Sequence, residues 1–321
     1  PPLDPHRVLD VLDLRGDPGG ILEQSLQVAN MFIPQGSLIA SVKGREGPMQ
    51  VESAKTSPIA PTIPLVILTD ERTASASEIV AGALQDHDRA LVVGQTSFGK
   101  GLVQGVYSLD GGYALKLTTG KWFTPSGRSI QRPRKFVNGA FVEEQPDTTE
   151  TNTSKKNRPA FKSDAGRTVY GGGGITPDVI VPDDTLTTPE QQFAKAVAPK
   201  SQEFRSTLED YSMELGKSAQ PNFTVQPAWM TEFFTRLQAK GVTSDRKLFD
   251  GASRYVSRLL DQRVAHYAFG DSSARRRDLP YDAALRKAIE LAQKGNSQRD
   301  LFAMAGEPLA NGARATPPKK P

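Results

Sequence analysis

Apolar runs and helical periodicities alternate along the first half of the chain. Residues 8–14 form an apolar run that ends in a cluster of glycine, proline and aspartate, which predicts a buried strand followed by a tight loop. Apolar positions between 21 and 32 recur at helical spacing. The stretches 64–69, 75–86 and 90–94 then repeat the order strand, helix, strand. Strands that alternate with helices favour parallel pairing, so an α/β fold is predicted here.

The pattern changes between residues 105 and 182. Residues 105–124 alternate in polarity around Asp110-Gly111-Gly112, which predicts a β-hairpin and gives the parallel sheet an antiparallel portion. Residues 132–164 are rich in proline, asparagine, threonine and charge, so a long surface loop is expected. Residues 171–182 return to a glycine turn and a short strand. The result is a mixed sheet within one domain, residues 1–182.

Beyond Pro182 the sequence becomes helical. Residues 183–200 have the composition of a linker, and 201–308 carry apolar side chains at three-to-four spacing, as at Phe233 and Leu237. These features predict a separate, mainly helical domain over 201–308. Residues 309–321 are expected to be disordered.

Composition narrows the chemistry. The chain has 321 residues and no cysteine, which excludes a thiol nucleophile, a thiolate zinc site and a disulfide. Its three histidines, His6, His87 and His266, show no metal-ligand spacing, so neither a metal nor another cofactor is expected. A net charge of +4 from 40 basic and 36 acidic residues is too balanced to predict nucleic-acid binding. Membrane association is not indicated, because no apolar run approaches the ~20 residues of a membrane helix.

Three polar loops are expected to converge at one edge of the parallel sheet, since the carboxyl ends of parallel strands open on the same side. Gly19-Gly20 follows the first strand, and residues 70–74 follow the second and lead to Ser75 at a helix start. The strand 90–94 leads back toward that helix start, and Lys100 lies six residues later. A serine, a lysine and glycine amides can therefore meet there.

Each of these residues also has an ordinary structural explanation. Ser75 and Glu78 fit a capping box, in which both side chains satisfy the start of a helix. Gly19-Gly20 can form a simple turn, and Lys100 can be a surface lysine. Ser77 competes with Ser75 as a nucleophile, although it should point about 200° around the helix from Ser75.

Residues 94–101 also match most of a phosphate-binding loop, G-x-x-x-x-G-K. The residue after Lys100 is Gly101, so the hydroxyl that binds Mg²⁺ in such loops is missing. Residues 102–107 are typical of a strand rather than of the helix that follows a phosphate-binding loop. A P-loop-like NTPase is therefore an unlikely alternative.

Five motifs occur in one order: DLRGDPGG (13–20), TASASEI (73–79), FGKGLVQ (98–104), GRSIQ (127–131) and GITPD (174–178). Together they resemble the catalytic core of the C-terminal processing, or tail-specific, serine proteases, over residues 9–182. The resemblance implies a crotonase-like α/β core of the kind shared by ClpP and crotonase. It makes Ser75 the nucleophile, Lys100 the general base and Gln104 the residue that orients the lysine. It also implies an oxyanion hole formed by the backbone N–H of Ala76 and one from Gly19 or Gly20.

A serine–lysine pair is chemically coherent if the lysine is uncharged. Serine attacks well only when a neighbouring group removes its proton. An ordinary lysine amine has a pKa of about 10.4, so activity at neutral pH requires burial that lowers it by roughly three units. Phe98, Leu102 and Val103 are expected to keep the Lys100 amine away from water. Gln104 can hydrogen-bond the amine without adding a charge.

The resemblance carries further expectations. The chain should be a serine endopeptidase that cleaves protein or peptide substrates near their C-termini, in the periplasm or elsewhere outside the cytoplasm, although no signal peptide is visible. The N-terminal segment and PDZ domain usual in the family are expected to be missing, and Asp17 stands where asparagine is common. The helical region is a candidate surface for homo-oligomer assembly. The alternative is a non-catalytic peptide-binding scaffold of the same fold.

Overall fold

The computed structural model describes residues 10–144, 150–182, 184–243 and 245–306. The chain divides into two compact units, one formed by 1–182 with 287–321 and the other by 183–286. Each unit is considered by itself below.

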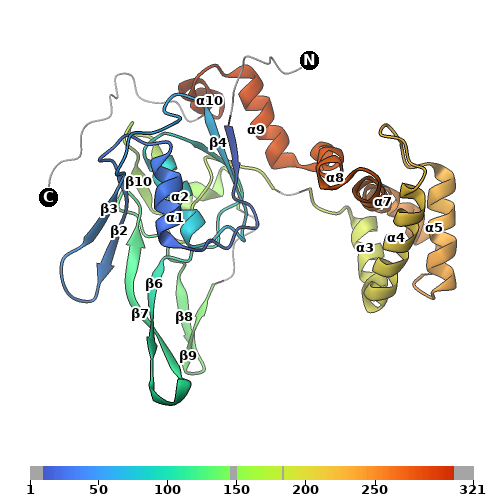
Figure 1. Cartoon of the computed structure of the whole chain (residues 1–321), viewed down its shortest axis with the longest axis horizontal. Helices are drawn as coiled ribbons and strands as arrows, with labels where there is room; N and C mark the ends of the chain where they lie inside the picture. The colour runs from blue at the N-terminus through green and yellow to red at the C-terminus, as the bar shows by residue number, and fades with distance from the viewer. Residues whose placement is uncertain (1–9, 145–149, 183, 244, 307–321) are drawn as a thin grey trace. The chain divides into compact units, whose positions relative to one another are not determined.

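A parallel sheet lies at the centre of the first unit. It contains β1 (Asp10–Asp13), β4 (Leu65–Thr69), β5 (Leu91–Gly94) and β12 (Val179–Ile180), in the order β1-β4-β5-β12. Every residue of β4 and β5 is buried, as the continuous apolar runs of the sequence predict. Helices α1 (Leu22–Asn30) and α2 (Ala76–Asp86) pack against each other and contribute to the same hydrophobic core (Figure 1).

The antiparallel strands form a second sheet instead of extending the first. Its strands are β2 (Leu38–Gly44), β3 (Gln50–Ser53), β6 (Leu102–Ser108) and β7 (Ala114–Phe123), in the order β3-β2-β7-β6. The expected hairpin is present, with its turn at 110–112. The expectation of a single mixed sheet is corrected because β7 pairs with β2, a strand that the sequence analysis did not predict.

Residues 132–164 contain more structure than the predicted loop. They include the hairpin of β8 (Arg134–Val137) and β9 (Ala140–Glu143), and strand β10 (Ala160–Lys162), which pairs with β11 (Thr168–Tyr170). Asn138 and Gly139 both have positive φ, as a two-residue hairpin turn requires. The hairpin was missed although Asn138-Gly139 is a turn signal, because the polarity of the residues on either side does not alternate.

The second unit is helical. It contains α3 (Thr188–Val197), α4 (Ser201–Gly216), α5 (Pro227–Ala239), α6 (Arg246–Gly251), α7 (Ser253–Phe269) and α8 (Asp271–Asp278). Aromatic rings fill its core, where Phe193, Phe233 and Phe249 are fully buried. Phe193 belongs to α3, so the stretch 183–200 contributes a packed helix rather than serving only as a linker.

The last helices return the chain to the first unit. Helix α9 (Ala283–Lys294) leads to α10 (Gln298–Met304), which packs beside β5. Gln298 Oε1 accepts a hydrogen bond of 2.8 Å from Leu65 N, and the buried Phe302 ring lies 4.2 Å from the Arg167 guanidinium. The structure thus groups residues from 287 with the first unit, whereas the sequence analysis put them in a helical domain ending at 308. The expected disordered tail, 309–321, lies outside the described residues.

Candidate active site

Hydrogen bonds join the loop after β1 to the loop after β4. Leu14 N donates to Leu68 O at 3.0 Å, Gly16 N to Asp70 Oδ1 at 2.9 Å, and Ala74 N to Asp17 O at 2.9 Å. Burial acts to raise the pKa of the Asp70 carboxyl, but donors from Gly16 and Arg72 outweigh it and leave that pKa below its usual value. The two loops therefore form one rigid edge at the carboxyl ends of β1 and β4.

Ser75 stands at the start of α2 in a strained backbone conformation. Its φ of 58° and ψ of −115° are unusual for a residue with a side chain. Ser75 is partly exposed, whereas Ser77 is buried. Strain of this kind collects at functional sites, and only Ser75 of the two serines is accessible. The geometry favours Ser75 as a nucleophile.

Gly19 packs directly against this helix start. A Cβ added to Gly19 would collide with Ala74 O and lie 2.7 Å from Ala76 N, and the φ of Gly19 is +78°. A side chain at Gly19 is therefore excluded both by space and by conformation. At Gly20 an added Cβ would meet open space.

The backbone donors near Ser75 differ in their availability. Gly19 N already donates to Asp17 Oδ1 at 3.0 Å. For the N–H groups of Ala76 and Gly20, no acceptor occurs within the described parts of the chain. The sequence left open which glycine completes the oxyanion hole, and the hydrogen bonding favours Gly20.

Glu78 connects the serine to the lysine. Its oxygen Oε2 accepts from Ser75 N at 2.7 Å and from Lys100 N at 2.8 Å, and Oε1 accepts from Gly99 N and Ser97 Oγ, both at 2.6 Å. Glu78 is fully buried, and burial raises the pKa of its carboxyl although each of the four donors lowers it. The backbones of Ser75 and Lys100 thus share one oxygen atom. Sequence analysis assigned Glu78 only to a capping box, because the second set of donors comes from a distant loop.

Lys100 and Gln104 are less enclosed than expected. Both are exposed, and Phe98, Leu102 and Val103 are only partly buried. Gln104 Nε2 donates to Thr118 Oγ1 at 3.4 Å, across the β6–β7 hairpin. The prediction that Lys100 is kept away from water is therefore wrong for this structure. The reason is that Lys100 lies just before β6, whose first residues Leu102 and Val103 are themselves only partly buried and leave the lysine open to solvent.

Residues of the motifs 127–131 and 174–178 hydrogen-bond to the loop 95–101. Ser97 Oγ accepts from Ile175 N at 2.6 Å, and Gln131 Oε1 accepts from Gly101 N at 3.0 Å. Sequence analysis gave neither Ser97 nor Gln131 a role, and no local pattern could have revealed contacts between residues so far apart. The loop leads into strand β6 rather than into a helix, which contradicts the phosphate-binding alternative.

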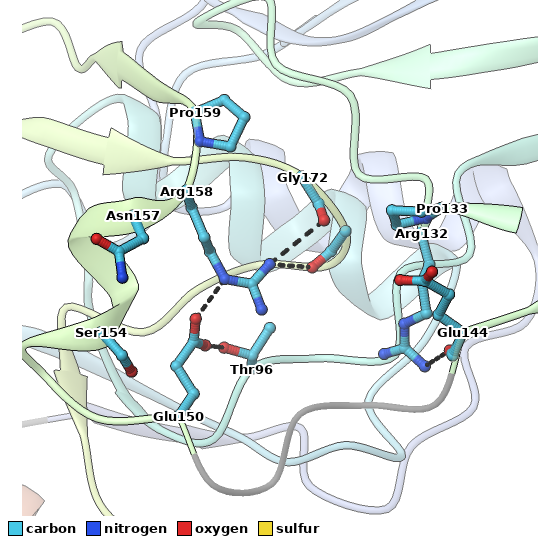
Figure 2. A pocket seen from close by; sticks show the side chains of 11 residues that line it. Thr96, Arg132, Pro133, Glu144, Glu150, Ser154, Asn157, Arg158, Pro159 and Gly172 are labelled. Carbon is cyan, nitrogen blue, oxygen red and sulfur yellow. Dashed lines mark hydrogen bonds and ion pairs between the residues drawn. The ribbon is translucent and has the colours of Figure 1, made fainter.

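A polar cavity of about 420 Å³ adjoins the same loop at Thr96. Figure 2 shows Arg158 at its centre, paired with Glu150 and hydrogen-bonded to the backbone of Gly172 and its neighbour. Thr96 Oγ1 donates to Glu150 Oε2 at 2.5 Å. On the other side of the cavity, Arg132 reaches Glu144 O. The hydrogen bond from Thr96 to Glu150 thus links the loop 95–101 to the segment 150–173, which also contains Arg158 and its partners.

Neither a metal site nor a membrane-spanning helix occurs in the part of the chain that the structure describes. No group of three or more histidine, aspartate or glutamate side chains there is arranged to hold a metal ion. None of the described helices is both long enough and apolar enough to cross a bilayer.

Comparison with known proteins gives matches over the N-terminal part of the chain. Residues 10–135 match the model of peptidase family S41. The carboxy-terminal-processing protease of Bartonella bacilliformis is 45% identical over 121 residues, which are 38% of this chain and 28% of that protein. The carboxy-terminal processing protease CtpA of Bacillus subtilis is 39% identical over 137 residues, 43% of this chain and 29% of that protein.

Among solved structures, the photosystem II D1 C-terminal processing protease matches 43% of this chain and 33% of its own, with 36% identity and a TM-score of 0.36. The chain thus spans under a third of the length of the curated relatives described above. The matched segments contain the loops around Ser75 and Lys100.

Proposed function

We propose that this chain, whose residues 10–135 match the model of peptidase family S41, is a serine endopeptidase that cleaves proteins near their C-termini. One observation carries the proposal: Glu78 Oε2 accepts hydrogen bonds from both Ser75 N and Lys100 N. The two backbone nitrogens are therefore no further apart than the sum of two hydrogen bonds. The processing proteases among the relatives support the type of cleavage.

In the proposed mechanism, Lys100 Nζ takes the proton of the Ser75 hydroxyl as Oγ attacks the peptide carbonyl carbon. The N–H groups of Ala76 and Gly20 donate to the developing oxyanion, a contribution of roughly 3 kcal/mol each. The protonated Lys100 then gives its proton to the leaving amine, and an acyl-enzyme forms on Ser75. Water, deprotonated by Lys100, hydrolyses this ester and frees the enzyme.

Substrate binding supplies the dry environment that Lys100 lacks in this structure. The amine must be uncharged to accept the proton of Ser75, and an exposed amine is stabilised in its charged form by water. A polypeptide laid over Ser75 would cover Lys100 and exclude that water. In this proposal Gln104 turns from Thr118 toward the lysine in the same step. The chain is then most active on substrates long enough to cover the lysine.

The core that supports this site is proposed to be crotonase-like, with α1 and α2 packed across the two sheets. Cleavage is proposed to occur outside the cytoplasm, and cell fractionation of the native protein would test this.

The helical unit remains a candidate for homo-oligomer assembly. The exposure of Lys100 favours one second candidate, a peptide-binding scaffold without catalysis.

Labelling by a fluorophosphonate probe, which reacts with activated serines, separates the two candidates. The enzyme is expected to be labelled, and both Ser75→Ala and Lys100→Ala should lose the label. Ser108→Ala and Lys121→Ala change an exposed serine and an exposed lysine outside the site and should retain it. Labelling that persists in either site variant would contradict the proposed pair, and an unlabelled wild-type chain would favour the scaffold.

A further inference from the structure

One face of the β6–β7 hairpin is apolar and exposed. Gly105 is paired with Leu117 and Tyr107 with Leu115, and Leu109 N donates to Tyr113 O at 2.8 Å. Residues directly opposite one another in an antiparallel pair lie on the same face. The exposed large side chains of this face, called the hairpin face below, are Tyr107, Leu109, Tyr113, Leu115 and Leu117, which are 42–74% exposed.

The hairpin face continues the inner face of the sheet. Val103 packs against the hydrophobic core. The register of the pair shifts between Val103 and Gln104, where the extra residue, Thr119, belongs to β7, so the alternation along β6 still puts Gly105 and Tyr107 on the side of Val103. The Tyr107 ring lies over Gly105, where an added Cβ would come within 2.9 Å of it. The β6–β7 hairpin projects from the body of the unit, as Figure 1 shows. The hairpin face is therefore an apolar surface, exposed to water, that adjoins the core at Val103.

The edge of the same hairpin is open. Among the residues that the structure describes, β6 is an edge strand that pairs with β7, so its other edge can offer N–H and C=O groups to a further strand. The strand LVQGVYS contains no charge and no proline, the residues that usually protect an edge from pairing. An open edge beside an apolar face is the surface to which an extended polypeptide adds as a strand, with main-chain hydrogen bonds and alternate apolar side chains.

The area of the hairpin face favours a transient occupant. Five large side chains, 42–74% exposed, present on the order of 500 Å² of apolar surface. Two copies joined face to face would bury about 1,000 Å², less than the roughly 1,200 Å² of a stable interface. A second copy of the chain is therefore disfavoured as a permanent partner.

We propose that the hairpin face and the open edge of β6 dock an extended, apolar segment of the substrate polypeptide. This inference rests on the proposed peptidase function. Lys100 lies two residues before the start of β6, and Tyr107 lies seven residues after Lys100, so the two are at most roughly 23 Å apart at 3.3 Å per residue. A substrate strand along β6 thus leads from the docking surface to the candidate active site. The preferred substrates are unfolded apolar segments rather than short peptides.

Binding is tested apart from catalysis with the Ser75→Ala chain and a permanently unfolded polypeptide, reduced and carboxymethylated α-lactalbumin carrying a fluorescent label. Anisotropy titration gives the dissociation constant. On this background, Leu115→Ser with Leu117→Ser is expected to weaken binding at least tenfold. Val106→Ser is the matched control, because Val106 is 66% exposed and lies on the opposite face of the same strand. The control should bind within twofold of the parent, and circular dichroism checks that all three chains are folded.

The outcomes distinguish this inference from the proposed function. Equal binding by the double variant and the parent would overturn the docking surface, whatever the labelling of Ser75 shows. If the wild-type chain is not labelled at Ser75, the proposed peptidase function is refuted, but the binding result still supports the docking surface. Light scattering that finds a dimer, dissociated by the double substitution, would assign the face to a second copy and overturn the inference.

Discussion

Replacing Glu78 by glutamine tests whether one buried carboxylate holds the serine and the lysine together. The substitution keeps the size of the side chain but turns one oxygen into an NH₂ group. Each oxygen of Glu78 accepts from two donors, so two of the four donors lose their acceptor. A buried donor without an acceptor costs about 1–3 kcal/mol, so the free energy of unfolding should fall by about 2–6 kcal/mol. That is a large share of the 5–15 kcal/mol of a typical domain.

Urea unfolding followed by circular dichroism measures this loss, and fluorophosphonate labelling of the folded fraction measures its effect on the site. Labelling of Glu78→Gln should slow at least tenfold under conditions where the chain is still folded, because Ser75 and Lys100 are no longer held by one atom. Glu46→Gln, at an exposed position, is the matched control and should change neither quantity. An unfolding free energy and a labelling rate equal to those of the wild type would refute the assigned role of Glu78.

Three other changes have defined outcomes. Gly19→Ala should slow Ser75 labelling at least tenfold, because the added methyl group would collide with the start of α2. Gly20→Ala should change the labelling rate far less, because its methyl group would lie in open space and the backbone N–H is kept. Asp17→Asn should speed labelling a few-fold, because the amide oxygen can still accept from Gly19 while a negative charge beside the proposed oxyanion is removed. Burial lowers the pKa of His87, but hydrogen bonds from its ring to Asp164 Oδ2 and to a backbone carbonyl outweigh this and raise it. Its contribution to stability is therefore complete below about pH 6.5 and lost as pH rises through the higher folded-state value. Urea midpoints at pH 6 and 8.5 should differ more in the wild type than in His87→Gln, and an equal difference would refute this.

The sequence predicted the parallel core and the convergence of its loops because those features leave local signals. Strands β4 and β5 are buried on both sides and give continuous apolar runs, and the loops that follow such strands open at one edge. The identity of the catalytic candidates came from the order of five motifs. The structure brings the backbones of Ser75 and Lys100 to one atom, as convergence requires.

Other features depend on contacts that no local pattern records. The sequence predicted only a helix cap for Glu78. Its other role was missed because three of its four hydrogen-bond donors lie about twenty residues away along the chain. The exposure of Lys100 follows from the partial burial of Leu102 and Val103, which their apolar character in the sequence does not reveal. The β8–β9 hairpin does leave one local signal, Asn138-Gly139 at its turn, but the polarity of its strands does not alternate, and Phe136 and Phe141 are both exposed with ring centroids 5.0 Å apart.

The central claim is that Ser75 is the nucleophile, and peptide mass spectrometry of the fluorophosphonate-treated chain tests it most directly. We expect the phosphonyl mass on the peptide that contains Ser75, and no label when Lys100 is replaced by alanine. A label on Ser77 or on a serine elsewhere, or a chain that remains unmodified while a peptide substrate is cleaved, would contradict the account.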